Sequence, residues 1–372
     1  MAARVASVSG GLRLLRTISQ THEIRSAPGR RLPAIQRVSN SKYLILCYHR
    51  VGTEGIPYYC TLPAQQFEMQ MRYLRRYCRV LSLAQLVDEI DNPPKEIGQA
   101  VAVTFDDGYS DLYRCALPIL RKYEIPATVY LTSDCIETGE VAWYDKIFLV
   151  LQVAEGSLFE VPINGGLQLP LGSVQQRIDS AVRIVSVLRK MPQAQRRNVC
   201  ALLERRVNLP REKLANRMLS WKQVHEMRAA GVFFGAHTLS HPALSQLSIE
   251  EVDRELRESR TILEKTLGEP VLDLAFPFGK PEDCGPFAYE VAVRCGYRSA
   301  VTTTWGYNTV GANMHALRRV QLGDEKTEAS FALQLHRAFF WANDDVTAGV
   351  SAGSLPQTTS KVRTRDSVLA QR

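Results

Sequence analysis

The chain has 372 residues, enough for one large α/β domain or two smaller ones, and its 45% hydrophobic content is ordinary for a soluble globular protein. No uninterrupted apolar run approaches the roughly 20 residues that span a bilayer, which argues against a membrane-spanning helix. The net charge of +8 lies almost entirely in residues 1–42, where eight basic residues face Glu23 alone, so the nearly neutral body is not expected to bind nucleic acid.

The basic segment 1–42 also carries apolar residues at roughly helical spacing. These are Val5, Val8, Leu12, Leu15 and Ile18. There is no long apolar core of the kind that a secretory signal peptide needs, so we expect a cytoplasmic protein, which this segment could hold at the inner face of the membrane. Three interpretations stay open: an amphipathic helix in peripheral membrane contact, an organellar transit peptide, or a disordered basic tail.

The eight cysteines form no Cys-x-x-Cys pair and no dense framework. Several of them lie among apolar neighbours in predicted strands or helices. This pattern favours buried free thiols in a reducing compartment.

A folded domain is expected from residue 43 to residue 340, followed by a disordered tail, 341–372, which is poor in apolar residues. In its first part, apolar runs of strand length alternate with apolar residues at helical spacing. Strands are predicted at 43–47, 80–81, 100–105 and 127–131, and helices at 67–77, 83–90 and 112–123. This alternation predicts parallel strands.

Residues 135–218 interrupt this rhythm. Gly165-Gly166 indicates a turn, and the apolar residues between Ile178 and Leu188 indicate a helix. We interpret the segment as a helical insertion packed on the main domain.

The alternation resumes after the insertion. Capping boxes are predicted at Ser220, for a helix that Gly231 ends, and at Ser248, for a helix that Gly268 ends. Strands are predicted at 232–236, 271–276, 297–303 and 317–322, and a helix at 287–295.

Polar residues stand at the carboxyl ends of several predicted strands. Asp106 and Asp107 follow strand 100–105, His237 follows strand 232–236, and Pro277 follows the next strand. The carboxyl ends of parallel strands share one rim, where α/β folds place their active sites. We therefore expect these residues on one rim of a parallel barrel or sheet.

The adjacent carboxylates Asp106 and Asp107 can serve one centre only if the chain turns at once, which Gly108 permits. One interpretation makes Asp107 a metal ligand and Asp106 a base. The other makes the pair a helix N-cap. The histidine pair downstream favours the first interpretation.

That pair is His237 and His241, four residues apart and followed by Pro242, which restricts the loop. The spacing favours two ligands of one metal, with Thr238 able to orient an imidazole through a hydrogen bond. Together with Asp107 they would form an incomplete shell, and an open position on a metal is where water becomes a nucleophile.

Two further features have two interpretations each. His49 ends the first strand on the same rim and either lines the site or is a satisfied strand-end histidine. Trp143, in Trp143-Tyr144-Asp145, is either a substrate-facing aromatic platform or a packing anchor for the insertion.

These motifs resemble those of the polysaccharide deacetylases with a NodB-homology domain, carbohydrate esterase family 4. Thr-Phe-Asp-Asp-Gly at 104–108 is similar to the first motif of that family, His-Thr-x-x-His-Pro at 237–242 to the second, and Phe-Pro-Phe-Gly at 276–279 to the third. Cys-Tyr-His-Arg-Val at 47–51 and Leu-Ser-Trp at 219–221 resemble a bacterial subgroup associated with surface-glycan synthesis.

The resemblance extends from residue 43 to about residue 322. It implies a distorted (β/α)7 barrel and a divalent metal, most often zinc. By motif position, the metal ligands would be Asp107, His237 and His241, and the general base would be Asp106.

The resemblance also implies residues that meet the substrate. The backbone N–H of Phe278 would help to hold the oxyanion. The other candidates for contact with the substrate are Pro277, Tyr109 and Trp143.

The chain departs from the family pattern at two places. The third motif often carries an Arg two residues before its proline, where this chain has Ala275. The last motif often carries a general-acid His after a Leu, but Leu317 is followed by two arginines here, and His315 precedes it. The acid stays open between His315, His49 and a water on the metal, and Arg319 could supply the missing guanidinium from another strand.

By resemblance, the chain is a hydrolase of a carbon–nitrogen bond other than a peptide bond. It would remove N-acetyl groups from an amino-sugar-containing glycan, such as a polysaccharide or a chitooligosaccharide, which would be its partner. One alternative keeps the site but changes the substrate to a lipid-linked sugar or another non-peptide amide. The other is a catalytically silent protein that binds or assembles glycans.

Overall fold

The computed structural model describes residues 41–52, 61–94, 98–163, 165–214, 217–322 and 325–340. The expectations for the basic N-terminal segment, apart from its last two residues, and for the tail beyond residue 340 lie outside these residues. Within the described ranges, no helix is both long and apolar enough to cross a membrane.

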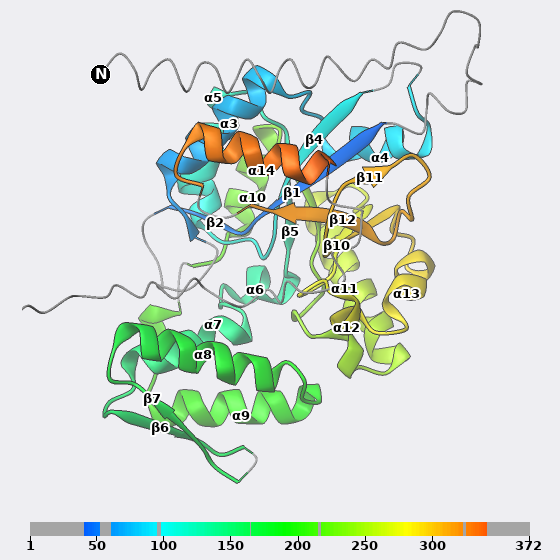
Figure 1. Ribbon diagram of the computed structural model, residues 1–372. Helices are drawn as coiled ribbons and strands as arrows, with labels where there is room; N and C mark the ends of the chain where they lie inside the picture. The colour runs from blue at the N-terminus through cyan, green and yellow to red at the C-terminus, as the bar shows by residue number, and fades with distance from the viewer. Residues whose placement is uncertain are drawn as a thin grey trace, which may run out of the picture.

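The core of the fold is a closed ring of seven parallel strands (Figure 1). In order around the ring, the strands are β1 (Lys42–Tyr48), β12 (Leu317–Gln321), β10 (Ser299–Trp305), β9 (Asp273–Ala275), β8 (Phe233–Ala236), β5 (Ala127–Leu131) and β4 (Gln99–Phe105). The ring closes because β4 pairs with β1 along seven residues. The predicted (β/α)7 barrel is therefore confirmed.

Strands β1 and β4 are buried at all but their first residue. Their apolar residues face the barrel interior on one side and the outer helices on the other, which is why these strands read as continuous apolar runs. The strand predicted at 80–81 is reduced to a single bridge between Val80 and Val101. The strand predicted at 271–276 is shorter in the structure, where it spans Asp273–Ala275.

The barrel is distorted where β1 meets β12. The short strand β11 (Asn308–Thr309) pairs antiparallel with the first two residues of β1, and direct pairing between β1 and β12 begins only at Leu46. The Asn308 side chain bonds the backbone N–H and C=O of Arg318 and so occupies the gap. Strands β1 and β12 thus pair directly at the carboxyl end of the barrel, and β11 separates them at the amino end.

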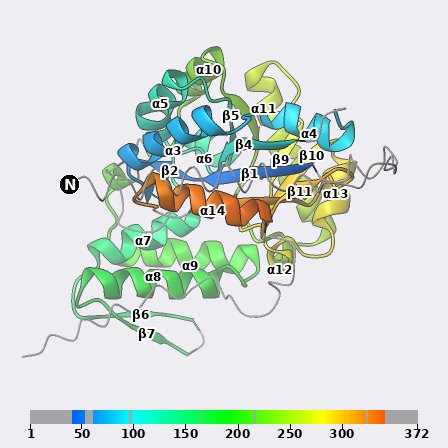
Figure 2. The ribbon, with the colours of Figure 1, turned by 45° about the horizontal axis from the view of Figure 1, so that its top comes forward.

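Helices cover the outside of the barrel (Figure 2). They are α3 (Ala64–Tyr77), α5 (Leu117–Lys122), α10 (Trp221–Ala229), α11 (Ile249–Leu267), α12 (Pro281–Cys284), α13 (Ala288–Arg294) and α14 (Glu328–Phe340). Helix α4 (Leu83–Asp91) instead packs on the apolar cluster inside the barrel. The predicted capping boxes at Ser220 and Ser248 are confirmed, as is the left-handed end of α11 at Gly268. The helix predicted at 112–123 begins with a π-helical turn, Leu112–Ala116, before α5.

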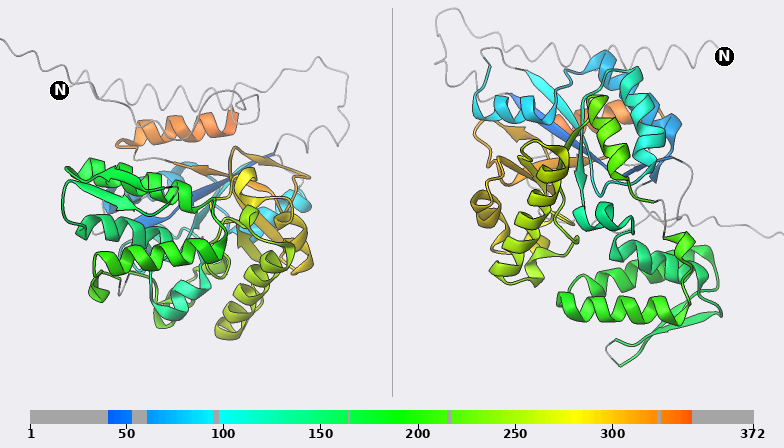
Figure 3. Two further views of the ribbon diagram at one scale, coloured as in Figure 1. Left: turned by 90° about the horizontal axis from the view of Figure 1, so that it is seen from below. Right: turned by 180° about the vertical axis from the view of Figure 1, so that it is seen from behind.

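After α6 (Ser133–Thr138), a helical group stands beside the barrel (Figure 3). It comprises α7 (Trp143–Val153), the hairpin of β6 (Leu158–Val161) and β7 (Leu167–Pro170), α8 (Val174–Leu188) and α9 (Gln193–Arg206). Only α8 was predicted from the sequence, and α7, α9, the hairpin and α14 were not. Helix α7 is buried on most sides and α9 has a weak apolar face, so neither gives a clear amphipathic pattern.

Candidate active site

The side chains that point into the barrel are apolar near its amino end and polar at its carboxyl rim. Ile45 of β1 and Ala102 of β4 belong to the apolar cluster inside the barrel, which α4 covers at the amino end. Residues two positions further along a strand point to the same side. Cys47 and Thr104 therefore form the next layer, and His49 and Asp106 the layer above it. By the same rule, Arg319 on β12 points to the same side as Leu317, into the barrel.

Asp106 and Arg319 form a buried, bidentate ion pair across the top of the barrel. Arg319 donates from Nη1 to Asp106 Oδ1 and from Nη2 to Oδ2, both at 2.7 Å. Burial raises the pKa of Asp106, but the charge and hydrogen bonds of Arg319 outweigh it and hold the pKa well below its usual range. Arg319 therefore stands where the guanidinium missing at Ala275 would be needed, and it keeps Asp106 ionised.

Asp107, His237 and His241 converge beside this pair. The Asp107 Oδ1 atom lies 3.5 Å from His237 Nε2 and 3.4 Å from His241 Nε2. All three side chains are buried, and Oδ1 has no hydrogen-bond partner. The structure thus brings together the three residues that the resemblance implies as metal ligands.

The protonation of these groups fits a cation. His237 Nδ1 lies 2.7 Å from the Ala275 carbonyl oxygen, which can only accept, so Nδ1 carries the proton and Nε2 presents a lone pair to Asp107. Burial lowers the pKa of both histidines, which keeps the imidazoles neutral. Burial, with the charge of Asp106 second, raises the pKa of Asp107. A divalent cation bound between the Asp107 carboxylate and the two imidazoles would accept their lone pairs and remove the repulsion between them.

Unusual backbone conformations concentrate at this rim. Six described non-glycine residues have positive φ angles, and four of them are Asp107 (72°), Thr238 (63°), His241 (54°) and Phe278 (60°). Such angles cost free energy and persist where the surrounding structure enforces them, often at functional sites. The turn that Gly108 permits after the carboxylates is present, with Asp107 itself left-handed.

The loop from Thr238 to Pro242 is held by a residue that the sequence did not indicate. The buried Glu255 on α11 accepts hydrogen bonds from the backbone N–H groups of Leu239 and Ser240 and from the Ser240 hydroxyl. Thr238 Oγ1 accepts from the His241 N–H, as its loop-supporting role anticipated, and Pro242 follows directly. The available signal was a Glu on the apolar face of the predicted helix, beside Leu256.

Glu255→Gln should weaken binding of Zn²⁺ about 10- to 100-fold, because an amide cannot accept all three of these hydrogen bonds and its N–H₂ group faces donors. Competition with a chromophoric chelator measures this affinity. The exposed Glu258 on the same helix gives the control Glu258→Gln, which should bind zinc like the parent. Equal affinities in the two variants would show that Glu255 does not position the loop.

The turn at Pro277 and Phe278 is held from β10. The Thr303 hydroxyl donates to the Phe278 carbonyl at 2.6 Å, and the Thr303 N–H donates to the Gly279 carbonyl at 2.9 Å. A Cβ at Gly279 would lie only 2.6 Å from the Thr303 nitrogen, so this turn requires glycine. The backbone of this turn is therefore held in place, and the centroid of the Phe278 ring lies 4.9 Å from that of the His241 ring.

Two of the residues predicted to contact the substrate, Tyr109 and Trp143, bind other protein groups. Tyr109 is buried, and its hydroxyl donates to Asp145 at 2.8 Å, so it does not face a substrate. Trp143 is half-buried, donates its indole N–H to the His241 carbonyl, and has the Arg196 guanidinium 4.8 Å from its ring centroid. These contacts favour the packing-anchor interpretation of Trp143 over the platform.

The two histidines considered as the acid lie at opposite ends of the barrel. His315 precedes β12, and its Nε2 is 2.9 Å from the carbonyl of Tyr297, which precedes β10. Parallel strands begin at the end away from the site, so the structure does not bring His315 to the rim, and this candidate is wrong. His49 lies beside Asp106, and its Nδ1 is buried without a hydrogen-bond partner.

Comparison with known proteins agrees with this geometry. The family model described as polysaccharide deacetylase matches residues 94–300, more than half of the chain. A curated relative, YxkH of Bacillus subtilis (strain 168), is named after the polysaccharide deacetylases. It is 20% identical over 294 residues, which cover 78% of this chain and 75% of YxkH.

Two solved structures share the fold. The Streptococcus pyogenes deacetylase PplD, solved in complex with acetate, superposes with a TM-score of 0.55 at 20% identity over 81% of this chain and 99% of PplD. IcaB from Ammonifex degensii superposes with a TM-score of 0.54 at 19% identity over 80% of this chain and 97% of IcaB.

Proposed function

The chain belongs to the polysaccharide deacetylase family and is a hydrolase of carbon–nitrogen bonds other than peptide bonds, and from this premise we propose a metal-dependent removal of N-acetyl groups from an amino-sugar-containing glycan. The observation that carries the proposal is the unpartnered Asp107 Oδ1 between two imidazole Nε2 atoms. The metal-binding residues are Asp107, His237 and His241, and zinc suits a set of two imidazoles and one carboxylate.

Asp106 is the general base. A bound cation would supply Lewis acidity, lowering the pKa of a water and polarising the acetyl carbonyl. Because Arg319 keeps Asp106 ionised, this carboxylate is ready to accept the proton of that water at neutral pH. Arg319 also fixes both carboxylate oxygens, which aims the base at the reacting centre.

The Phe278 turn stabilises the charge that develops on the acetyl oxygen. Its backbone N–H, in the Pro277–Phe278 peptide, donates to the oxyanion. The carbonyl of that peptide accepts from the Gly279 N–H, and Thr303 holds the next peptide through the Phe278 carbonyl. One well-placed donor of this kind typically contributes about 10²–10³ in rate.

His49 delivers the proton to the leaving amine. Burial lowers the pKa of His49 to about 4, so the imidazole is neutral at pH 7 and can accept a proton before passing it on. Its position beside Asp106 suits a relay from the base, through His49, to the amine nitrogen.

His49→Ala should lower the rate of N-acetyl hydrolysis by about 10²-fold or more, because an amine is a poor leaving group without a proton. An aryl ester such as 4-nitrophenyl acetate has a leaving group that needs no proton, so its hydrolysis should change far less. The ratio of the two rates measures the role. A parallel loss on both substrates would contradict proton delivery by His49.

Acetate release tests the proposed function as a whole. Purified protein loaded with one equivalent of zinc should release acetate from N-acetylchitooligosaccharides or a related N-acetyl glycan. The same panel should include a lipid-linked N-acetyl sugar, a cyclic amide and a formamide. Activity on one of these alone would change the substrate and keep the site. A folded, zinc-loaded protein inert on every member would favour the silent glycan-binding alternative.

A further inference from the structure

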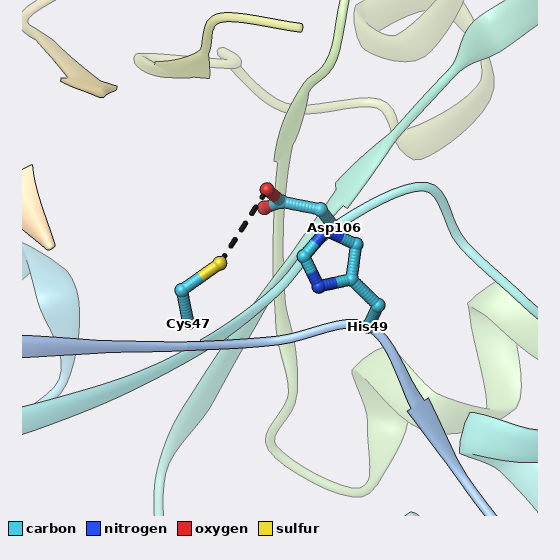
Figure 4. A group of neighbouring side chains, drawn as sticks. All are labelled: Cys47, His49 and Asp106. Atoms are coloured by element: carbon cyan, nitrogen blue, oxygen red, sulfur yellow. Dashed lines mark hydrogen bonds between the residues drawn. The ribbon is translucent and has the colours of Figure 1, made fainter. Parts of the chain in front are cut away.

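A second group of potential ligands includes the proposed base itself. Cys47, His49 and Asp106 each offer one ligand atom, and these atoms all lie within 4.8 Å of one another. The Cys47 thiol is 3.7 Å from Asp106 Oδ2, and Figure 4 shows the three side chains gathered at the ends of neighbouring strands. β1 and β4 are adjacent and in register, Cys47 opposite Thr104, which brings the side chains together.

The three atom types suit a thiophilic cation. A thiolate, an imidazole and a carboxylate form a mixed sulfur, nitrogen and oxygen set, which favours Zn²⁺ or Cd²⁺ over Mg²⁺ or Ca²⁺. The buried Nδ1 of His49 has no hydrogen-bond partner, so the imidazole has an unused position. A separation of 3.7 Å between sulfur and oxygen is close to that expected across a tetrahedral ion.

The ion pair between Arg319 and Asp106 leaves Asp106 able to bind a cation as well. A carboxylate has about four lone-pair positions, and Arg319 uses one on each oxygen of Asp106. An ion could therefore bind Asp106 Oδ2 without breaking the pair. The guanidinium and a cation at Asp107 would both repel it, so this second site should be the weaker one.

We propose that Cys47, His49 and Asp106 form a second, inhibitory site for a thiophilic divalent cation such as Zn²⁺ or Cd²⁺. Binding releases the Cys47 thiol proton to solvent and leaves a metal–thiolate bond. The inhibitory part rests on the proposed function, because the ion would occupy lone pairs of the base Asp106 and of the relay His49. The binding part stands on the geometry alone.

Cobalt titration of the full chain tests the binding. The Asp107, His237 and His241 site contains no sulfur, so the first equivalent of Co²⁺ should give no thiolate-to-cobalt charge-transfer band in the near ultraviolet. The second equivalent should give that band, and Cys47→Ser should abolish it while retaining the first equivalent. Absence of the band at saturation, or its persistence in Cys47→Ser, would overturn the proposal.

Cys135 provides the matched control. It is another buried thiol, close enough to Asp107 that the carboxylate charge contributes, after burial, to raising the pKa of the thiol. Cys135→Ser should therefore keep the cobalt band. If the band follows Cys135 instead of Cys47, the proposed site is wrong.

Inhibition by excess zinc tests the consequence. Relative to the rate of each variant at one equivalent of zinc, Cys47→Ser should need about tenfold more free zinc for half-inhibition than the parent or Cys135→Ser. Unchanged inhibition in Cys47→Ser would overturn the regulatory part. A cobalt band without acetate release would refute the proposed function alone, and acetate release without the band would refute the second site alone.

Discussion

Asp106→Asn should lower kcat for acetate release by about 10²- to 10⁴-fold while the protein keeps one equivalent of metal. The amide cannot accept the proton of the attacking water, and Asp106 is not one of the three converging ligands. Steady-state kinetics and elemental analysis of the same preparation measure the two quantities. Activity within a few fold of the parent, with full metal content, would remove Asp106 from the role of base.

This substitution also affects stability, because within the described residues the fully buried Arg319 guanidinium forms its ion pair with Asp106. Breaking a buried ion pair from one side leaves an uncompensated charge and typically costs about 3–5 kcal/mol. Asp106→Asn should therefore lower the free energy of unfolding as well as kcat, and urea denaturation measures the loss.

The double variant Asp106→Asn with Arg319→Met separates the two effects. Removing both charges eliminates the unpaired guanidinium, and replacing a buried pair by apolar groups is often neutral for stability. The double variant should regain most of the lost unfolding free energy without regaining activity. If activity returned together with stability, the loss in Asp106→Asn would have been one of folding and not of proton transfer.

Much of the barrel could be predicted because local patterns determine it. The apolar runs at 43–47 and 100–105 are strands buried on both faces, and Ser220 and Ser248 open helices through bonds that span three residues. The convergence of Asp107 with His237 and His241 followed from one rule, that parallel strands end at a common rim.

The contacts that hold the site were harder to predict because they join residues distant in sequence. Arg319 and Asp106 are 213 positions apart in the sequence. Glu255 belongs to helix α11, and it accepts a hydrogen bond from Leu239 in the loop that precedes that helix. His315 was misplaced for a related reason. Its distance along the chain from Leu317 is small, but it precedes the strand. Only the direction of β12 shows that this end of the barrel lies away from the rim.

The double variant His237→Ala with His241→Ala should lose the metal and lower acetate release by at least about 10³-fold, because a bound cation contributes several kcal/mol and each 1.36 kcal/mol is a factor of ten. Elemental analysis after dialysis measures the metal. Chelation should lower Tm of the parent but not of the variant, since a ligand stabilises only the state that binds it. Stoichiometric metal retained by the variant when Cys47→Ser also removes the second site would contradict the ligand assignment.

His315→Ala is the matched control for this loss, because it removes one imidazole from the same barrel at the end away from the rim. It should keep both the metal and the rate of acetate release, whereas a histidine that donates the proton to the amine could not be removed without loss. If His315→Ala lost activity with full metal content, proton delivery by His49 and the placement of the acid at the rim would both fail. If only the paired substitution at His237 and His241 loses the metal, the loss follows from the position of the imidazoles and not from the removal of histidine as such.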